Sequence, residues 1–255
     1  MTHPIRPYLP VIFLPVSDLK RSIEWYCELF ELPVLPKHDG GGIYYFGMQG
    51  TDLILDSNMK GLPPMTMFDA SDIDGAYAFC RAQGYAQVGE LFRYPNVAHF
   101  SVGSNMVCQC DRAYVDDAPH PLLPRIAKVF AHVGQTGVAP DWYETFVQRP
   151  RERDALIDGC ESIRMERGAD LLFDDGTFGG TAPTYFERLQ LALRADPAFL
   201  IESPDAEAAL SYVRSKGGTI TQELEAKRGV VAFQFADPDG NGIMVAQKAS
   251  KEAAK

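Results

Sequence analysis

The chain has 255 residues, of which 46% are hydrophobic and 23% are charged, and its formal net charge is −10. This length accommodates one large domain or two of ordinary size, each with its own core. The acidic balance argues against a nucleic-acid partner or an anionic membrane surface, because both need concentrated Lys and Arg. We also expect a cytoplasmic protein, since no apolar run is long enough to span a bilayer and the N-terminus does not resemble a secretory signal.

The first part of the chain predicts a strand, a helix and then further strands. An apolar run at 11–14 precedes a helix whose N-cap is Ser17 or Asp18. Two more strands are predicted at 43–48 and 52–56, separated by Gly and polar residues. The order is that of a small unit in which one helix connects a strand to several others.

A second copy of this unit begins at Met65. It predicts a strand at 65–68, a helix that starts near Ser71 and ends at Gly84, and a hairpin over 98–110. The helix sequence DIDGAYAFCRAQGY aligns without gaps to DAEAALSYVRSKGG, which occurs later in the chain. The sequence therefore contains an internal duplication.

A linker is predicted near the middle of the chain. Residues 116–124 combine charge and prolines without any periodicity. Beyond them a strand is predicted at 126–133 and a helix from Asp141. The run ADLLFD at 169–174 then repeats TDLILD at 51–56. The second half of the chain therefore repeats the organisation of the first.

The last unit closes with a hairpin of clear turn chemistry. Residues 235–247, FADPDGNGIMVAQ, place Pro, Asp, Asn and Gly between two apolar strands. A strand at 198–201 and a helix at 206–216 precede this hairpin. The second copy is longer than the first, which predicts an insertion near 175–196, either a lid over a pocket or an ordinary connection. The tail at 249–255 is expected to be solvated.

Five cysteines form an odd and scattered set, so we expect reduced thiols rather than a disulfide framework or a zinc ribbon. Cys108 and Cys110 would share one face of a strand. They are either two small core residues or, with His99, a soft-metal or thiol site.

Four units of strand, helix and three strands, together with DPDGN in the closing hairpin and the helix start SDLKRSIEWY, resemble the vicinal oxygen chelate superfamily. This is the fold of glyoxalases, bleomycin-resistance proteins and extradiol dioxygenases. The resemblance implies an α+β protein in which four βαβββ modules pair into two half-open barrel domains. The domains would span 1–115 and 125–248, joined by the linker at 116–124.

The same resemblance implies where a divalent metal would bind. The family's ligands are the inward residue of each module's first strand and a Glu on the last strand. In the first domain these positions fall near Val11, Met65 and Cys108, and in the second domain at His132, near Ala198 and at Met244. Only His132 is a usual ligand, and a lone imidazole binds no metal tightly. We therefore expect no metal site of the family type and no cofactor, with a divalent metal ion as the alternative.

Polar residues near His132 suggest how the second barrel could still act. Glu202 and Gln234 are predicted to form a polar patch with His132 in the second cavity. The patch could be a substitute metal site, an acid-base site in a metal-free pocket, or a satisfied core histidine. We take His132 and Glu202 as the candidate catalytic residues.

Strand alternation also predicts residues that contact a ligand. Aromatic walls with few polar groups suit a flat organic molecule. The candidate ligand-binding residues are Tyr45, Tyr94, His99, Phe100, Gln234 and Met244.

These observations predict a small-molecule-binding protein of the glyoxalase and bleomycin-resistance type. It would act on an organic ligand by sequestration or by acid-base chemistry, as a monomer or homodimer. The alternative is a metal-dependent lyase, isomerase or dioxygenase of the same superfamily.

Overall fold

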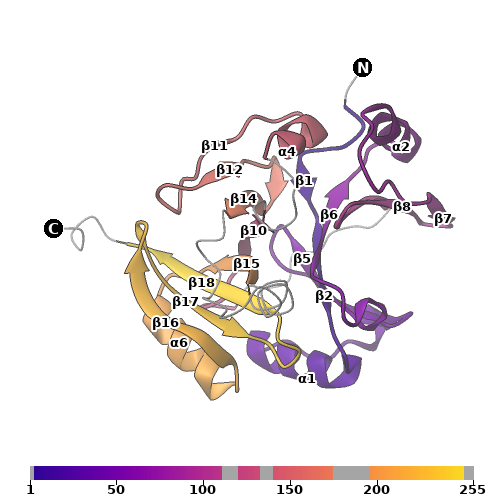
Figure 1. Ribbon diagram of the computed structural model, residues 1–255. Coiled ribbons are helices and arrows are strands. Elements are labelled where there is room, and N and C mark those ends of the chain that lie inside the picture. The colour runs from indigo at the N-terminus through magenta and orange to yellow at the C-terminus, as the bar shows by residue number, and fades with distance from the viewer. Residues whose placement is uncertain (1–2, 111–119, 133–139, 175–195, 250–255) are drawn as a thin grey trace.

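The computed structural model describes residues 3–110, 120–132, 140–174 and 196–249. Two eight-stranded sheets, each with helices on one face, lie side by side (Figure 1). This arrangement confirms the predicted α+β fold with two curled half-barrel sheets. None of the described helices is long and apolar enough to cross a membrane.

The first sheet has the strand order β3-β4-β5-β2-β6-β9-β8-β7. Helices α1 (Leu19–Phe30) and α2 (Ile73–Ala82) belong to this half, with short 3-10 turns at Pro36–His38 and Ser57–Met59. The strands, in chain order, are β2 (Val11–Pro15), β3 (Asp39–Gly40), β4 (Ile43–Phe46), β5 (Asp52–Asp56), β6 (Met65–Asp69), β7 (Phe92–Tyr94), β8 (Val97–Val102) and β9 (Asn105–Cys110).

The second sheet has the order β11-β12-β14-β10-β15-β18-β17-β16. Its helices are α4 (Pro140–Val147) and α6 (Ala206–Ser215). The strands are β10 (Ile126–His132), β11 (Glu152–Arg153), β12 (Glu161–Ile163), β14 (Asp170–Asp174), β15 (Pro197–Glu202), β16 (Thr219–Lys227), β17 (Val230–Ala236) and β18 (Gly242–Lys248).

The pairing pattern repeats from one sheet to the other. In the first sheet β2 pairs in parallel with β5 and antiparallel with β6, and β6 pairs in parallel with β9. In the second sheet β10 pairs in parallel with β14 and antiparallel with β15, and β15 pairs in parallel with β18. The duplication inferred from the sequence is therefore also a duplication of topology.

Aspartate side chains start three of the helices. Asp18 accepts a hydrogen bond from the backbone N–H of Arg21, and Asp72 and Asp205 do the same for α2 and α6. Such N-caps satisfy backbone donors that have no partner inside the helix. Of the two N-caps considered for α1, the structure uses Asp18.

Buried side chains divide according to the face of the sheet on which they lie. One large cluster includes Ile12 and Phe68 of the first sheet together with Val129 and Phe199 of the second, so the two sheets share a core on their helix-covered faces. The opposite, concave faces carry separate, smaller clusters. These concave faces are the places where the resemblance predicts a site.

The DPDGN hairpin ties the last module to the first. Asp239 Oδ1 accepts a hydrogen bond of 2.8 Å from the backbone N–H of Ser17, and its Oδ2 accepts one of 2.8 Å from Ser22 Oγ. Tyr26 Oη donates to Asp237 Oδ2 at 2.9 Å, and Asn241 Nδ2 donates to the Pro15 carbonyl oxygen at 3.0 Å. The turn residues therefore also join the two domains.

A second connection joins the domains at the start of the chain. Strand β1 (Tyr8–Leu9) pairs in parallel with β13 (Arg167–Gly168) of the other half. Thr51 Oγ1 donates to the Leu9 carbonyl at 2.6 Å and accepts from the Ala169 N–H at 2.7 Å. Gly168 has φ of +80°, and a Cβ there would lie 2.5 Å from the Leu9 oxygen. Glycine is therefore required at this crossing.

The predicted linker and insertion are only partly described. Residues 116–119 and 175–195, and the tail beyond residue 249, lie outside the described residues. At the described end of the linker, Leu123 is fully buried and the His120 ring lies 4.5 Å from that of Tyr212. This end of the linker therefore packs against the second domain rather than crossing open solvent.

Candidate functional site

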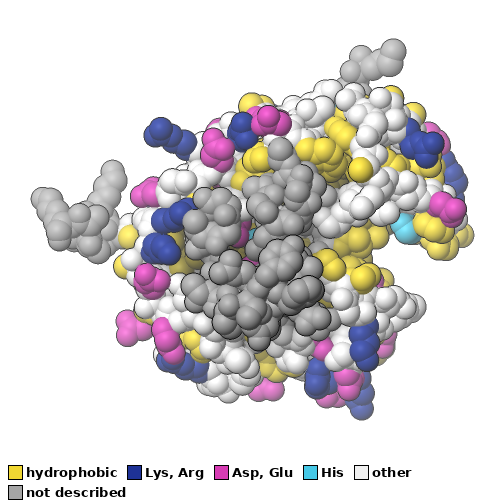
Figure 2. All heavy atoms as spheres, viewed as in Figure 1, with side chains coloured by type: hydrophobic (Ala, Val, Ile, Leu, Met, Phe, Trp, Pro, Cys, Tyr) yellow, Lys and Arg dark blue, Asp and Glu magenta, His cyan; other side chains and the backbone are white. Residues whose placement is uncertain are grey.

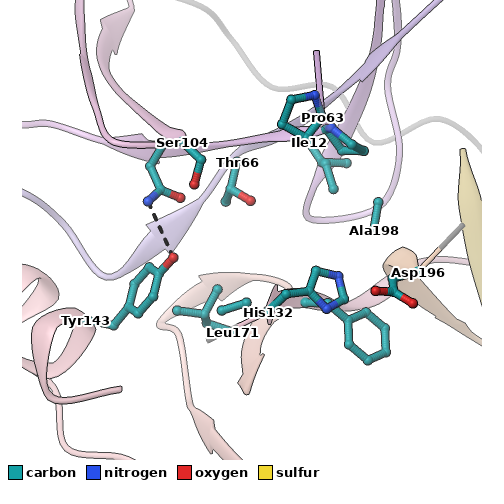
Figure 3. Close-up of a pocket in the computed structure, with 13 residues that line it drawn as sticks. Ile12, Pro63, Thr66, Ser104, His132, Tyr143, Leu171, Asp196 and Ala198 are labelled. Carbon is teal, nitrogen blue, oxygen red and sulfur yellow. Dashed lines mark hydrogen bonds between the residues drawn. The ribbon is translucent and has the colours of Figure 1, made fainter. Parts of the chain in front are cut away.

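A cavity of about 150 Å³ lies between the two sheets (Figure 3). Ile12 of β2 and Thr66 of β6 are directly paired across the first sheet and face it from one side. Ala131 of β10 and Leu171 of β14 face it from the other. The helix-covered faces of both sheets therefore contribute to the same cavity.

Apolar walls and a few polar atoms give this cavity its character. The other apolar lining residues are Pro63, Pro64, Phe130 and Ala198. The polar lining residues are Thr66, Ser104, Asn105, His132, Tyr143 and Asp196. An apolar pocket with a small number of polar groups is the usual composition of a small-molecule site.

His132 ends β10 and reaches the cavity from the second sheet (Figure 3). Its Nδ1 lies 2.9 Å from Oδ2 of Asp174, its parallel partner in the ladder, and its Nε2 lies 3.1 Å from the Pro197 carbonyl oxygen. Both partners accept hydrogen bonds, so both contacts form when both ring nitrogens carry hydrogen. The Asp174 side chain has no exposed surface and would balance the charge of such an imidazolium.

Tyr143 provides a polar atom at another part of the cavity. Its hydroxyl oxygen accepts a hydrogen bond of 3.4 Å from Asn105 Nδ2 (Figure 3). Burial raises the pKa of Tyr143, so its phenol remains a neutral O–H donor at ordinary pH. Together with the Thr66 hydroxyl, Tyr143 can bind a hydroxyl or carbonyl group of a ligand.

The register of the sheets corrects one position of the predicted metal site. Val11 pairs with Asp52 in the first sheet, and Lys128 pairs with Asp170 in the second. Because 51–56 and 169–174 are the repeated strands, Lys128 is the residue equivalent to Val11. His132 is paired four residues further along the ladder and is not equivalent to Val11.

The last-strand position is corrected in the same way. Met67 is paired with Met106, and Leu200 is paired with Met244. Since Met67 is opposite Val11 and Leu200 is opposite Lys128, the counterpart of Met244 is Met106. Cys108, which the sequence suggested, lies two residues further along the strand.

The residues at these positions do not fit the metal that the fold family implies. The first domain has Val11, Met65 and Met106, and the second has Lys128, Ala198 and Met244. None of these side chains offers the carboxylate or imidazole that a hard divalent ion prefers, and an ammonium group has no lone pair to donate. Throughout the described ranges, no three or more His, Cys, Asp or Glu residues are grouped so that they could hold a metal ion.

Lys128 is instead buried between two carboxylates. Its Nζ lies 2.6 Å from Asp154 Oδ2 and 2.9 Å from Asp170 Oδ2, and the Asp154 side chain has no exposed surface. Burial acts to lower the pKa of Lys128, but the two carboxylates outweigh it and raise the pKa. Burial acts to raise the pKa of Asp154, and the bonds and charge of Lys128 lower it overall. Both directions favour the charged pair.

The predicted polar patch of the second barrel does not assemble. His132 contacts Pro197 at the start of β15, whereas Glu202 ends that strand, about 16 Å away at the rise of a β-strand. Glu202 instead forms an ion pair of 2.8 Å with Arg125. The Nε2 of Gln234 donates to Gln222 Oε1 at 2.9 Å.

Other predicted ligand-binding residues are dispersed. Gln234 and Met244 line a hollow of about 20 Å³ in the second barrel, which is too small for an organic ligand. Phe100 is fully buried on the helix-covered face, where its ring lies 5.1 Å from that of Tyr77. Tyr45 stacks on His38 with ring centroids 3.8 Å apart.

Tyr94 and His99 lie at the outer edge of the first sheet. Their ring centroids are 6.0 Å apart, and Tyr94 is 59% exposed. Figure 2 shows hydrophobic side chains reaching the surface in this region, where β7 lies. His99 is paired with Cys108, and burial lowers the pKa of His99. Within the part of the chain that the structure describes, His99, Cys108 and Cys110 do not form a group that could hold a metal ion.

Several cavity residues could not be identified from the sequence. Thr66 and Leu171 alternate onto helix-covered faces, where the strand pattern predicts ordinary core. The sequence around Ser104 and Asn105 is typical of a hairpin turn, and Tyr143 is predicted to lie on the apolar face of a helix. Only the packing of one domain on the other brings them together.

Comparison with known proteins adds a family. Residues 8–111 match the model described as Glyoxalase/Bleomycin resistance protein/Dioxygenase superfamily. No curated protein sequence matches the chain.

Solved structures resemble the whole chain. A catechol 2,3-dioxygenase is similar over 97% of this chain and 91% of that one, with 14% identity and a TM-score of 0.62. A halotolerant catechol dioxygenase covers 98% and 90%, with 10% identity and a TM-score of 0.59. A 2,2',3-trihydroxybiphenyl 1,2-dioxygenase from Sphingomonas wittichii covers 96% and 91%, with 12% identity and a TM-score of 0.56. These likenesses concern the fold. The family model therefore places residues 8–111 in the glyoxalase, bleomycin resistance protein and dioxygenase superfamily, and the solved structures show that the chain as a whole has the same fold.

Proposed function

We propose that this protein binds a small, flat organic molecule in the cavity between its two sheets, without a metal site of the family type. The observation that carries the proposal is the cavity itself, about 150 Å³ with apolar walls and polar atoms from both sheets. A cavity of about this size holds a benzene-sized molecule in a protein core. The family-type metal positions of the second barrel, by contrast, contain Lys128, Ala198 and Met244.

The polar atoms favour a ring that carries hydroxyl groups. Tyr143 Oη can donate, and Asp196 is a buried acceptor on the cavity wall. The names of the similar structures, catechol 2,3-dioxygenase among them, supply hydroxylated aromatic rings as the first class to test. Catechol is small enough for this cavity and is the probe we choose.

The mode of action has two forms that share this site. Sequestration needs only a complementary cavity. Acid-base chemistry needs a positioned proton, and the hydrogen-bonded pair of His132 and Asp174 is the observation that favours it. His132 can transfer a proton to a ligand only by exchanging its contact to Asp174 or Pro197, so sequestration is the simpler form.

Calorimetric titration with catechol tests the site. We expect His132→Gln and Tyr143→Phe to weaken catechol binding about tenfold each, equivalent to about 1.4 kcal/mol. Gln234→Met, in the small hollow of the second barrel, is the matched control and should leave affinity unchanged. Loss of affinity in the control alone, or no binding to the wild-type protein, would overturn the proposal.

Turnover measurements separate the alternatives. Unchanged affinity with lost conversion in His132→Gln would identify an acid-base enzyme. A metal-dependent dioxygenase is the second candidate, because the similar structures carry that name. Oxygen uptake with catechol that requires added Fe²⁺ would support the metal-dependent function instead.

A further inference from the structure

The second barrel contains a cluster of charge that includes an ammonium group, whereas the first has an apolar side chain at the position of that ammonium. Lys128 stands at the position equivalent to Val11, and its ammonium lies between Asp154 and Asp170. The described contacts also engage the other carboxylate oxygens. Asp154 Oδ1 accepts from the N–H groups of Leu156 and Ile157 at 2.9 and 2.8 Å. Asp170 Oδ1 accepts a hydrogen bond from the backbone N–H of Met165 at 3.0 Å.

Buried charges persist when each has hydrogen-bonded partners, and all four oxygens here have a donor. The cluster therefore has the donors and acceptors of a completed ion site. Its cation comes from the chain itself.

One of the carboxylates belongs to a segment that enters the barrel. Residues 154–160 connect β11 to β12 at one edge of the second sheet, and β16 to β18 form the other edge (Figure 1). Leu156 and Ile157 are buried in the concave cluster that also contains Leu200 and Met244. This segment therefore fills the space in front of the equivalent metal positions.

The outer side of the segment is tied to the opposite edge of the sheet. The Asp158 N–H donates to the Arg228 carbonyl at 2.8 Å, and Lys248 Nζ donates to the Ala155 carbonyl at 2.9 Å. Arg228 also places Nη1 2.9 Å from Cys160 Sγ. These contacts span the open side of the half-barrel.

We propose that the Lys128 ammonium takes the place of the metal ion in the second barrel and, through Asp154, holds residues 154–160 across its mouth. The barrel is closed to ligands by this internal cation. The inference goes beyond the ligand proposed for the cavity between the sheets and does not depend on it.

If Lys128 occupies the place of a metal ion, its removal should leave Asp154 and Asp170 as a cation site. Without Lys128, the buried Asp154 and the partly buried Asp170 need a replacement charge, and carboxylate oxygens suit Mn²⁺. Lys128→Ala should bind Mn²⁺, seen as loss of the free-ion signal in electron paramagnetic resonance. Wild-type protein and Lys128→Ala combined with Asp154→Asn should leave that signal unchanged.

Hydrogen exchange tests the closure separately. In Lys128→Ala without metal, the amides of Leu156 and Ile157 should exchange at least tenfold faster, and Mn²⁺ should restore their protection. The amide of Val129, in the shared core, is the internal reference and should change less.

Three results would overturn the inference. The first is binding of Mn²⁺ by the wild-type barrel through Asp154 and Asp170. The second is a folded Lys128→Ala that neither binds Mn²⁺ nor exposes Leu156 and Ile157. If Lys128→Ala does not fold alone, refolding with Mn²⁺ decides: recovery supports the inference, and no recovery with Mn²⁺ contradicts it.

Discussion

The two concave faces of this molecule have the same topology and opposite chemistry. In the first sheet, Val11 and Met67 face each other within an apolar cluster. In the second sheet their counterparts are Lys128 and Leu200, and Lys128 is paired with two carboxylates. The duplicated modules thus place an apolar side chain and an ammonium group at equivalent points.

This difference shows that a half-barrel of this fold can be stabilised without a metal in two ways. The first sheet fills its concave face with Met, Phe and Val side chains, which gain by leaving water. The second keeps a charge and surrounds it with acceptors. The first solution removes the polar ligands that a divalent ion needs, and the second keeps two carboxylates but pairs them with an ammonium group of the chain. The cavity between the sheets remains as the place for a ligand.

The largest predicted effect breaks the charged side of this comparison. Lys128→Met should lower the free energy of unfolding by about 3–5 kcal/mol, because it leaves the buried Asp154 and the partly buried Asp170 without their cation. Chemical denaturation measures the loss. Adding Asp154→Asn and Asp170→Asn should recover most of it, and a stable Lys128→Met alone would contradict the assigned ion pair.

Truncation at the matched apolar position should affect both sheets alike. Met67→Ala and Leu200→Ala each remove a buried side chain next to the equivalent strand, and each should lower stability by about 2–5 kcal/mol. Denaturation of the two variants under one set of conditions gives the comparison. A loss confined to one variant would show that the concave faces are not equally packed.

A smaller effect is expected where the last module contacts the first. Tyr26→Phe removes the hydrogen bond to Asp237, a carboxylate that is 4% exposed, and should lower stability by about 1–2 kcal/mol. Asp237 keeps its bonds from Asn241, which limits the loss. Thermal unfolding measures the change, and Tyr94→Phe on the exposed edge strand is the control that should show none.

The smallest predicted effect concerns acid. Burial acts to raise the pKa of Asp239, but the bonds from Ser17 and Ser22 and the nearby Arg21 lower it overall below the usual value of an aspartate. A depressed folded pKa means that Asp239 stabilises the protein above its unfolded pKa and loses this contribution as pH falls through the folded value.

We therefore expect Asp239→Asn to lower stability at neutral pH and to reduce the steepness of the loss below about pH 4. Asp237 also faces this network, and burial raises its pKa, so its titration acts in the opposite sense. Asp74→Asn, on an exposed carboxylate paired with Arg93, is the matched control. Parallel pH profiles for Asp239→Asn and wild type would contradict the role given to Asp239.

Much of the fold could be predicted from the sequence because its causes are local. The caps Asp18, Asp72 and Asp205, the DPDGN turn and the repeated runs at 51–56 and 169–174 all mark elements that the structure contains. The family resemblance implied inward positions for Val11 and Met244, and both lie in the clusters of the concave faces.

The site was less predictable because it depends on register and on domain packing. His132 was assigned to the first-strand ligand position that the family resemblance implies, but the ladder shows Lys128 to be the counterpart of Val11. A displacement of four residues keeps the same face of a strand, so alternation alone cannot detect it. Residues such as Tyr143 meet the cavity only through contacts between modules that are distant in the chain.

The short ladder between β1 and β13 has a consequence for how a ligand would enter. It runs from one domain to the other, and Thr51 bonds both Leu9 and Ala169 at its end. Opposite it, the Asp239 contacts fasten the first helix to the last hairpin. These two sets of contacts join the domains at separate places and oppose a hinge motion between them. Exchange with the interior would therefore proceed through rotation of individual side chains, and access would be governed by local breathing rather than by hinged opening.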